Sequence, residues 1–280
     1  MDYLERRVSM VEDRLESVIS TIEPSTLADE ISHVALAGGK RVRPAVTILS
    51  CEACGGEPSA AVDFAVAVEC VHNASLVVDD IIDRSEVRRG SRSAWANFGY
   101  GPALITSDGL LGEAFALLSQ SERATEIVAQ SMVELGEGEA VELVAQPTTE
   151  SEYIELARRK TGALFRAAAE VGAVAADADP FTVDSFGEYA ERVGIAFQIR
   201  DDVLDTTGSI AELGKPAGQD AAMNRPSLVQ ITELSEQEAN SRAEKQAEQA
   251  LNALAAADVH ESQSLGYLKD LAEFVVVREQ

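Results

Sequence analysis

Apolar residues recur at helical spacing along almost the whole chain of 280 residues, and the alternating pattern of a half-buried strand is missing. Ala, Leu, Glu and Val predominate between the glycines and prolines. The pattern predicts a single all-α domain over residues 1–280. A segment rich in Gly, Pro, Asp and Asn, residues 205–227, is expected to form a loop. Helices are expected over residues 2–20, 25–37, 59–84, 102–119, 123–145, 150–176, 181–206, 235–256 and 264–278.

The composition narrows the class of protein. Apolar residues make up 46% of the chain, which excludes extensive disorder, and no uninterrupted apolar run reaches the ~18 residues of a membrane span. Cys51 and Cys54 have CxxC spacing, but no second Cys or His pair lies nearby to complete a zinc site, so buried thiols are expected. No secretory leader opens the chain, and a cytoplasmic location is expected.

The charge balance is strongly acidic, with 48 acidic residues against 23 basic ones and a formal net charge of -25. Such a field repels nucleic acid and disfavours a general role in binding it. Only five of the basic residues are lysines, which suggests a halophilic protein adapted to molar salt; an ordinary acidic cytosolic protein is the alternative. In so acidic a chain, clustered Arg and Lys side chains point to an anion-binding site.

Two aspartate clusters share the spacing DDxxD, and each ends an apolar helical segment. Aspartates four residues apart lie on one helix face, where they repel one another unless a cation lies between them. Hard oxygen ligands suit Mg²⁺, which usually binds one or two carboxylates together with substrate phosphates. Either cluster alone could be a solvated helix end, but the repetition favours two clusters that face each other and bind one diphosphate through Mg²⁺. The clusters are Asp79, Asp80 and Asp83, and Asp201, Asp202 and Asp205.

Basic residues gather where a diphosphate site needs them. The loop GGKRVRP carries Lys40, Arg41 and Arg43, and Arg88 with Arg89 follows the first aspartate cluster. Arginine forks match phosphate oxygens, although surface ion pairs are the simpler explanation for any one of them. Two further lysines, Lys160 and Lys215, lie in segments that could converge on the same site.

These motifs, in this order, resemble the trans-isoprenyl diphosphate synthases of the polyprenyl synthetase family, and within it a haloarchaeal geranylgeranyl-type enzyme. The resemblance rests on GGKRVRP, ECVHNASLVVDDIIDRSEVRRG, KTGALF, FQIRDDVLD and LGKPAGQD. It implies a bundle of ten or more helices around a deep central cavity, usually homodimeric. It also implies condensation of an allylic diphosphate with isopentenyl diphosphate, using about three Mg²⁺ ions per active site.

The resemblance assigns roles to individual residues. The six aspartates would bind Mg²⁺ and the allylic diphosphate. Isopentenyl diphosphate would be bound by Lys40, Arg43, His72 and Arg89. The allylic diphosphate would be contacted by Arg88, Lys160 and Lys215. The developing allylic cation would be stabilised by Thr161 and Gln198. The chain departs from the family pattern at Val78, Arg200 and Asn224–Ser227.

Product length is predicted from the helix that ends in the first cluster. Short-chain relatives often have an aromatic residue five positions before the first aspartate, where this chain has the small Ala74. Phe64 is the first bulky residue on the adjoining stripe, about 22 Å from Asp79 at ~1.5 Å rise per residue. That depth favours about twenty carbons, and hence geranylgeranyl diphosphate. The stripe consists of Ser75, Val71, Val68 and Phe64.

Other functions remain open at this point. If other helices set the floor of the cavity, the product would be a longer polyprenyl diphosphate of the C25–C40 range. A non-catalytic subunit of a heteromeric synthase is disfavoured because the aspartates and basic residues are all present. A terpene cyclase is disfavoured because cyclases usually lack the GGKRxRP loop.

Overall fold

The computed structural model describes residues 2–207, 228, 231 and 234–277, and it confirms the all-α prediction. The first helices are α1 (Tyr3–Ile19), α2 (Ser25–Ala35), α3 (Val42–Ala53) and α4 (Pro58–Ile82). A small hairpin follows, made of β1 (Val87–Arg88) and β2 (Ser91–Arg92). The central helices are α5 (Ala94–Phe98), α6 (Tyr100–Leu118), α7 (Glu122–Val144) and α8 (Glu150–Ala157). The remaining elements are the π-helix η1 (Arg158–Gly162), α9 (Ala163–Ala175), α10 (Pro180–Thr207), α14 (Glu236–Ala256) and α15 (Gln263–Val277).

The local sequence explains where several helices begin. Asp2, Thr149 and Ser235 form capping boxes at the starts of α1, α8 and α14. Before α10, the Asp179 carboxylate accepts a hydrogen bond of 2.9 Å from the backbone N–H of Phe181. The box at Ser235 confirms the helix start expected there.

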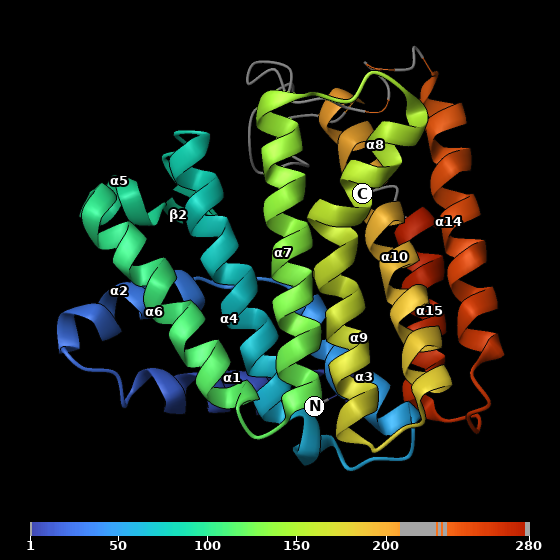
Figure 1. Cartoon of the computed structure of the whole chain (residues 1–280), viewed down its shortest axis with the longest axis horizontal. Coiled ribbons are helices and arrows are strands. Elements are labelled where there is room, and N and C mark those ends of the chain that lie inside the picture. The colour runs from blue at the N-terminus through green and yellow to red at the C-terminus, as the bar shows by residue number, and fades with distance from the viewer. Residues whose placement is uncertain (1, 208–227, 229–230, 232–233, 278–280) are drawn as a thin grey trace.

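The helices pack as a bundle in which α10 lies between α9 and α14, and α9 also packs against α7, α3 and α4 (Figure 1). The other face of α4 packs against α6. At the contact between α9 and α3, a Cβ added to Gly172 would lie 2.1 Å from the carbonyl oxygen of Thr47. The close approach of these two helices therefore requires a glycine at this position.

The core of the bundle is built around α4. By length and composition alone this helix could cross a membrane, but 67% of its most apolar 18-residue window is buried inside the molecule. Core helices of water-soluble proteins pass the same test, so the evidence for a span is weak. The apolar wall that α4 provides ends at the first aspartate cluster.

The structure differs from the sequence expectation in several places, among them α5, where no helix was expected, and η1, which interrupts the helix expected over residues 150–176. The periodicity predicted no helix at α3, because nearly all its side chains are buried and the polar face that reveals a helix is missing. The strands β1 and β2 span only two residues each, too few for a strand pattern, and are joined by Arg89 and Gly90 with φ of 51° and 78°. The helix expected over residues 181–206 and the loop expected from residue 205 overlapped; α10 continues to Thr207, and the rest of the loop segment up to residue 227 lies outside the described residues.

Candidate active site

The first aspartate cluster lies at the C-terminal end of α4. Asp79 and Asp80 are in the last turn of the helix, and Asp83 is its C-cap residue. The C-terminus of a helix carries negative partial charge, so carboxylates there need cations nearby. The second cluster begins at Asp201 and Asp202, close to the end of α10.

A cavity of about 270 Å³ lies between the two helices that carry these clusters. Four of the side chains around it are basic, in a chain whose net charge is -25. The cavity is therefore locally positive although the protein as a whole is negative. The carboxylate of Asp201, from the second cluster, also lines it. It brings together seven of the predicted site residues: Lys40, Arg43, His72, Arg89, Thr161, Gln198 and Asp201.

The loop that carries Lys40 is fixed by a buried ion pair. Arg41, in the left-handed region at φ 48°, donates from Nη1 to Glu69 Oε1 at 2.5 Å and from Nη2 to the carbonyl of Ala35 at 2.7 Å. The side chains of Arg41 and Glu69 are 1% and 2% exposed. Breaking such a pair leaves an uncompensated buried charge, so the loop has little freedom to move. Lys40 itself is exposed at the cavity edge.

Arg43 and His72 form a second fixed pair on the cavity wall. Arg43 Nη1 donates to His72 Nε2 at 3.2 Å, and the Arg43 guanidinium lies 4.5 Å from the centre of the Phe165 ring. Burial, together with the charges of Arg43 and Arg89, lowers the pKa of His72 well below its usual value. The imidazole is therefore neutral at physiological pH. Burial also lowers the pKa of Arg43 to about 10, which leaves the guanidinium charged.

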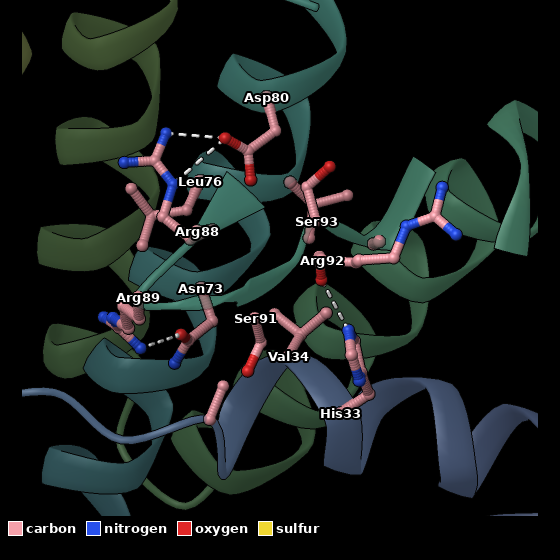
Figure 2. A pocket seen from close by; sticks show the side chains of 13 residues that line it. His33, Val34, Asn73, Leu76, Asp80, Arg88, Arg89, Ser91, Arg92 and Ser93 are labelled. Atoms are coloured by element: carbon pink, nitrogen blue, oxygen red, sulfur yellow. Dashed lines mark hydrogen bonds and ion pairs between the residues drawn. The ribbon is translucent and has the colours of Figure 1, made fainter. Parts of the chain in front are cut away.

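The hairpin presents two arginines that are fixed differently (Figure 2). Arg88 donates from Nε at 3.0 Å and from Nη2 at 2.6 Å to Oδ1 of Asp80, whose side chain is 4% exposed. Arg89 donates from Nη1 to the carbonyl of Gly38 at 2.8 Å and to Oδ1 of Asn73 at 3.2 Å. In this structure Asp80 thus binds a protein cation.

The predicted lysine of the KTG motif lies in the π-helix η1, a type of turn that is frequent at functional sites. Lys160 Nζ lies 3.0 Å from Glu139 Oε1 and also contacts Glu142, both on α7. Burial would lower the pKa of Lys160, but the carboxylates of Glu142, Glu139 and Asp79 outweigh it and raise that pKa. Burial and the charge of Asp79 raise the pKa of Glu139 to about 7. The charge of Asp79 therefore reaches both Lys160 and its partner Glu139, which places the first aspartate cluster near this lysine.

Hydrogen bonds connect Thr161 to the second cluster. Thr161 Oγ1 donates to Gln198 Oε1 at 2.7 Å, and Gln198 Nε2 donates to Asp202 Oδ1 at 2.9 Å. The other carboxylate oxygen of Asp202 accepts from the hydroxyl of Tyr153 and, at 3.4 Å, from the backbone N–H of Leu228. Asp202 is 6% exposed and Tyr153 is 2% exposed. The carboxylate of Asp202 is therefore positioned by protein donors, whereas Asp201 is exposed at the cavity.

The carboxylates fit Mg²⁺ that binds together with a diphosphate. Within the described part of the chain, no group of three or more His, Cys, Asp or Glu side chains lies close enough to hold a metal ion alone. Mg²⁺ in phosphate-binding sites keeps several waters and takes one or two carboxylates. Asp79 and Asp83 at the end of α4, and Asp201 on α10, supply hard oxygen donors of this kind.

Some predicted residues lie elsewhere or outside the described region. Lys215 and Asn224–Ser227 lie outside the described residues, as does the side chain of Asp205. Arg200, which departs from the family pattern, is 7% exposed and donates to Asn240 of α14. That bond joins α10 to α14, next to Asp201 of the second cluster.

The predicted chain-length residues all lie on α4. Ala74 is 1% exposed, Val71 3% and Phe64 5%, so each packs within the apolar core. Ser75 is half-buried and donates to the backbone carbonyl of His72 at 2.8 Å. Their part in product length stays a prediction.

Both cysteines of the CxxC pair are free thiols; Cys51 is buried, as expected, whereas Cys54 is only half-buried. Burial raises the pKa of Cys51 to about 11 and that of Cys54 to about 12. Both thiols are protonated at neutral pH, and the thiolate is the form that reacts or binds metal.

The sequence analysis missed five residues that fix the predicted ones. Glu69 and Asn73 lie within the motif ECVHNASLVVDDIIDRSEVRRG but were assigned no role there, whereas the other three belong to no quoted motif. An acidic pair three residues apart on the predicted helix 123–145 is the one signal that pointed to Glu139 and Glu142. The five residues are Glu69, Asn73, Glu139, Glu142 and Tyr153.

The fold and the site together define an all-helical enzyme class that binds diphosphates between two aspartate-bearing helices. The profile of the family described as Polyprenyl synthetase matches residues 24–265. The short chain isoprenyl diphosphate synthase of Methanothermobacter thermautotrophicus is 35% identical over 243 residues, which cover 84% of this chain and 75% of that protein. The chain belongs to the polyprenyl synthetase family and is a trans-prenyltransferase.

Solved structures agree with this assignment. The geranylgeranyl pyrophosphate synthetase of Geoglobus acetivorans superposes with a TM-score of 0.87 at 32% identity, covering 98% of this chain and 97% of that one. The heptaprenyl diphosphate synthase of Staphylococcus aureus superposes with a TM-score of 0.90 at 28% identity, covering 100% and 99%. The same fold thus serves enzymes named for products of different length.

Proposed function

We propose that this protein condenses an allylic diphosphate with isopentenyl diphosphate and releases geranylgeranyl diphosphate or a longer polyprenyl diphosphate. One observation carries the proposal. In a chain of net charge -25, the cavity beside the two aspartate-bearing helices is lined by four basic side chains. Two anionic substrates need such a concentration of positive charge.

Isopentenyl diphosphate binds to Lys40, Arg43 and Arg89, beside the neutral imidazole of His72. Arg43 and Arg89 are fixed by His72, Asn73 and the carbonyl of Gly38 before any substrate arrives. Preorganised donors of this kind stabilise charge without reorganising during the reaction. Arg88, Lys160 and Lys215 are the proposed contacts of the allylic diphosphate.

The allylic diphosphate binds with Mg²⁺, about three ions per site. Asp79, Asp83 and Asp201 would hold these ions, together with Asp205, and the ions supply Lewis-acid neutralisation of the leaving diphosphate. The buried Asp80 and Asp202 serve a different purpose, because their carboxylates orient Arg88 and Gln198.

The allylic carbon–oxygen bond breaks with both electrons leaving on the diphosphate. The double bond of isopentenyl diphosphate then attacks the cation, and a proton lost to the released diphosphate restores an alkene. The side-chain oxygens of Thr161 and Gln198 line the cavity and stabilise the positive charge. The apolar wall of α4 excludes water, which would otherwise trap the cation.

Geranylgeranyl diphosphate is the proposed product. Ala74, five residues before Asp79, is small, so the side chain at this level of α4 would not block a growing chain as an aromatic ring would. A longer product is the second candidate, because the superposable enzymes include one named for heptaprenyl diphosphate. In that case Phe64 is ordinary core packing and another helix limits the chain.

The assembly and setting of the enzyme are part of the proposal. Large apolar side chains are exposed on α6 and α7, among them Leu104 at 51%, Ile105 at 56% and Val133 at 54%. Exposed apolar side chains can mark interaction sites, and we assign these to contacts with a second copy of the chain in a homodimer. We further propose a cytoplasmic, halophilic enzyme with no membrane span. Light scattering of the purified protein in molar salt should give twice the chain mass of 29.8 kDa.

The function is tested by incubating purified protein with labelled isopentenyl diphosphate, Mg²⁺ and each allylic primer in turn. Products are then separated by chain length. A prenyl diphosphate whose main species has about twenty carbons supports the full proposal. A longer main product refutes the chain-length part, and no product with any primer contradicts the function itself.

A further inference from the structure

The side chain of Asn73 lies fully buried on α4, between the loop that carries Lys40 and the hairpin. Its Nδ2 donates to the backbone carbonyl of Glu69 at 2.8 Å and to the Glu69 carboxylate at 3.1 Å. Its Oδ1 accepts from Nη1 of Arg89 at 3.2 Å (Figure 2). Both ends of the amide are therefore used.

The orientation of this amide is determined by its neighbours. Turning the amide over would place Oδ1 against two acceptors of Glu69 and Nδ2 against the donors of Arg89. Glu69 itself is fixed by the buried ion pair with Arg41. A continuous set of contacts thus runs from Arg41 through Glu69 and Asn73 to Arg89, and it leaves one orientation for the Asn73 carbonyl.

The two arginines of the hairpin differ in how their charge is compensated. Arg88 is paired with the carboxylate of Asp80. Arg89 donates through Nη1 to two neutral acceptors, Asn73 and the carbonyl of Gly38. Among the described residues, no hydrogen-bond partner is found for Nε or Nη2 of Arg89. The Arg89 guanidinium is therefore oriented without an ion pair, and its charge stays available to an anion in the cavity it lines.

We propose that Asn73 is a positioning residue for the binding of isopentenyl diphosphate, because its carbonyl holds the Arg89 guanidinium in the orientation that receives the diphosphate. The inference rests on the proposed function, in which Arg89 contacts this substrate. A neutral side chain is essential to the role. A carboxylate at position 73 would still accept from Arg89 but would compensate its charge and repel both Glu69 and the substrate.

The experiment measures KM for isopentenyl diphosphate, KM for the allylic primer and kcat in three variants. Asn73→Leu has a similar size and removes every hydrogen bond of the amide. Asn73→Asp keeps an acceptor opposite Arg89 and adds a charge. Ser107→Ala is the matched control, since it removes another buried side-chain hydrogen bond to α4, the 3.2 Å bond to the carbonyl of Ala74.

Both Asn73 variants should raise KM for isopentenyl diphosphate about tenfold or more, the size expected for losing a hydrogen bond that orients a charged group. KM for the primer should change no more than about twofold, because Arg88 keeps its own partner Asp80. The control should leave both KM values unchanged. A merely structural role for Asn73 would lower kcat or raise both KM values together, and that result would overturn the inference.

Arg89→Gln separates this inference from the proposed function. If it leaves KM for isopentenyl diphosphate unchanged, the assignment of Arg89 fails and the inference fails with it. If Arg89→Gln raises this KM and the Asn73 variants do not, the inference alone is wrong. Should Asn73→Leu not fold, Asn73→Asp decides, and an unchanged KM for isopentenyl diphosphate in that variant contradicts the role.

Discussion

Removing the hydroxyl of Tyr153 should weaken both the fold and the reaction. Tyr153→Phe deletes one donor to Asp202, a carboxylate that is 6% exposed. A hydrogen bond to a charged group contributes about 1.5–3 kcal/mol to stability, so the free energy of unfolding should fall by about that amount. Asp202 also accepts a hydrogen bond from Gln198, so without the Tyr153 hydroxyl both side chains are held less firmly. Because Gln198 stabilises the developing cation in the proposed reaction, kcat should fall several-fold.

The assay is urea unfolding with linear extrapolation, combined with steady-state kinetics at saturating substrates. Tyr189→Phe is the matched control. Tyr189 is also fully buried, and its hydroxyl donates at 2.6 Å to the neutral carbonyl of Leu268, away from the cavity. A bond between neutral groups contributes about 0.5–1.5 kcal/mol, so this variant should lose less stability and keep its kcat.

The comparison of the two tyrosines decides whether the charge of Asp202 matters. Equal losses of stability would show that Asp202 accepts this bond no more strongly than a neutral carbonyl. An unchanged kcat in Tyr153→Phe would show that Asp202 does not orient Gln198 for the reaction. Either result would refute the reasoning.

Three further predictions follow from other parts of the molecule. The lowered pKa of His72 means that below about pH 6.5 the unfolded chain binds a proton that the folded chain does not. The free energy of unfolding should therefore fall as the pH drops below 6.5, by up to about 1.4 kcal/mol per pH unit relative to His72→Gln, and parallel curves for the two proteins would contradict this. The melting temperature should rise steeply from low to molar KCl, since salt screens the net charge of -25; a flat curve counts against halophilic adaptation. Ala74→Phe should shorten the product to about fifteen carbons or fewer, and Phe64→Ala should lengthen it. An unchanged product length in both variants would show that α4 does not set product length.

Much of the fold could be predicted because its signals are local. The capping box at Ser235 and the apolar periodicity of most helices lie within short stretches of sequence. The helix α3 escaped prediction because it is buried on nearly all sides. The π-helix η1 could not be predicted either, since an extra residue in a helical turn leaves no mark in the apolar pattern.

The candidate site was predictable to the extent that its chemistry is concentrated in motifs. The motif DDxxD gives no reason to distinguish the aspartates within a cluster, but in the structure they differ in burial and in hydrogen-bond partners. Asp80 and Asp202 are 3% and 6% exposed and bind Arg88 and Gln198, whereas Asp201 is exposed at the cavity. Arg88 and Gln198 lie only eight and four residues from their aspartates, but a further partner of Asp202 is distant in sequence. The bond from Tyr153 to Asp202 spans 49 residues, and no local pattern reports it.

The central claim is that the two aspartate clusters act together on one substrate in one cavity. Turnover of Asp79→Ala, Asp201→Ala and the double variant, measured with Mg²⁺ and both substrates, tests this directly. Each single variant should lose several orders of magnitude in kcat while keeping its far-UV spectrum, and the double variant should lose little more than either, because residues that act as a unit are not additive. Near wild-type turnover in either single variant, or losses that simply multiply in the double variant, would contradict the claim.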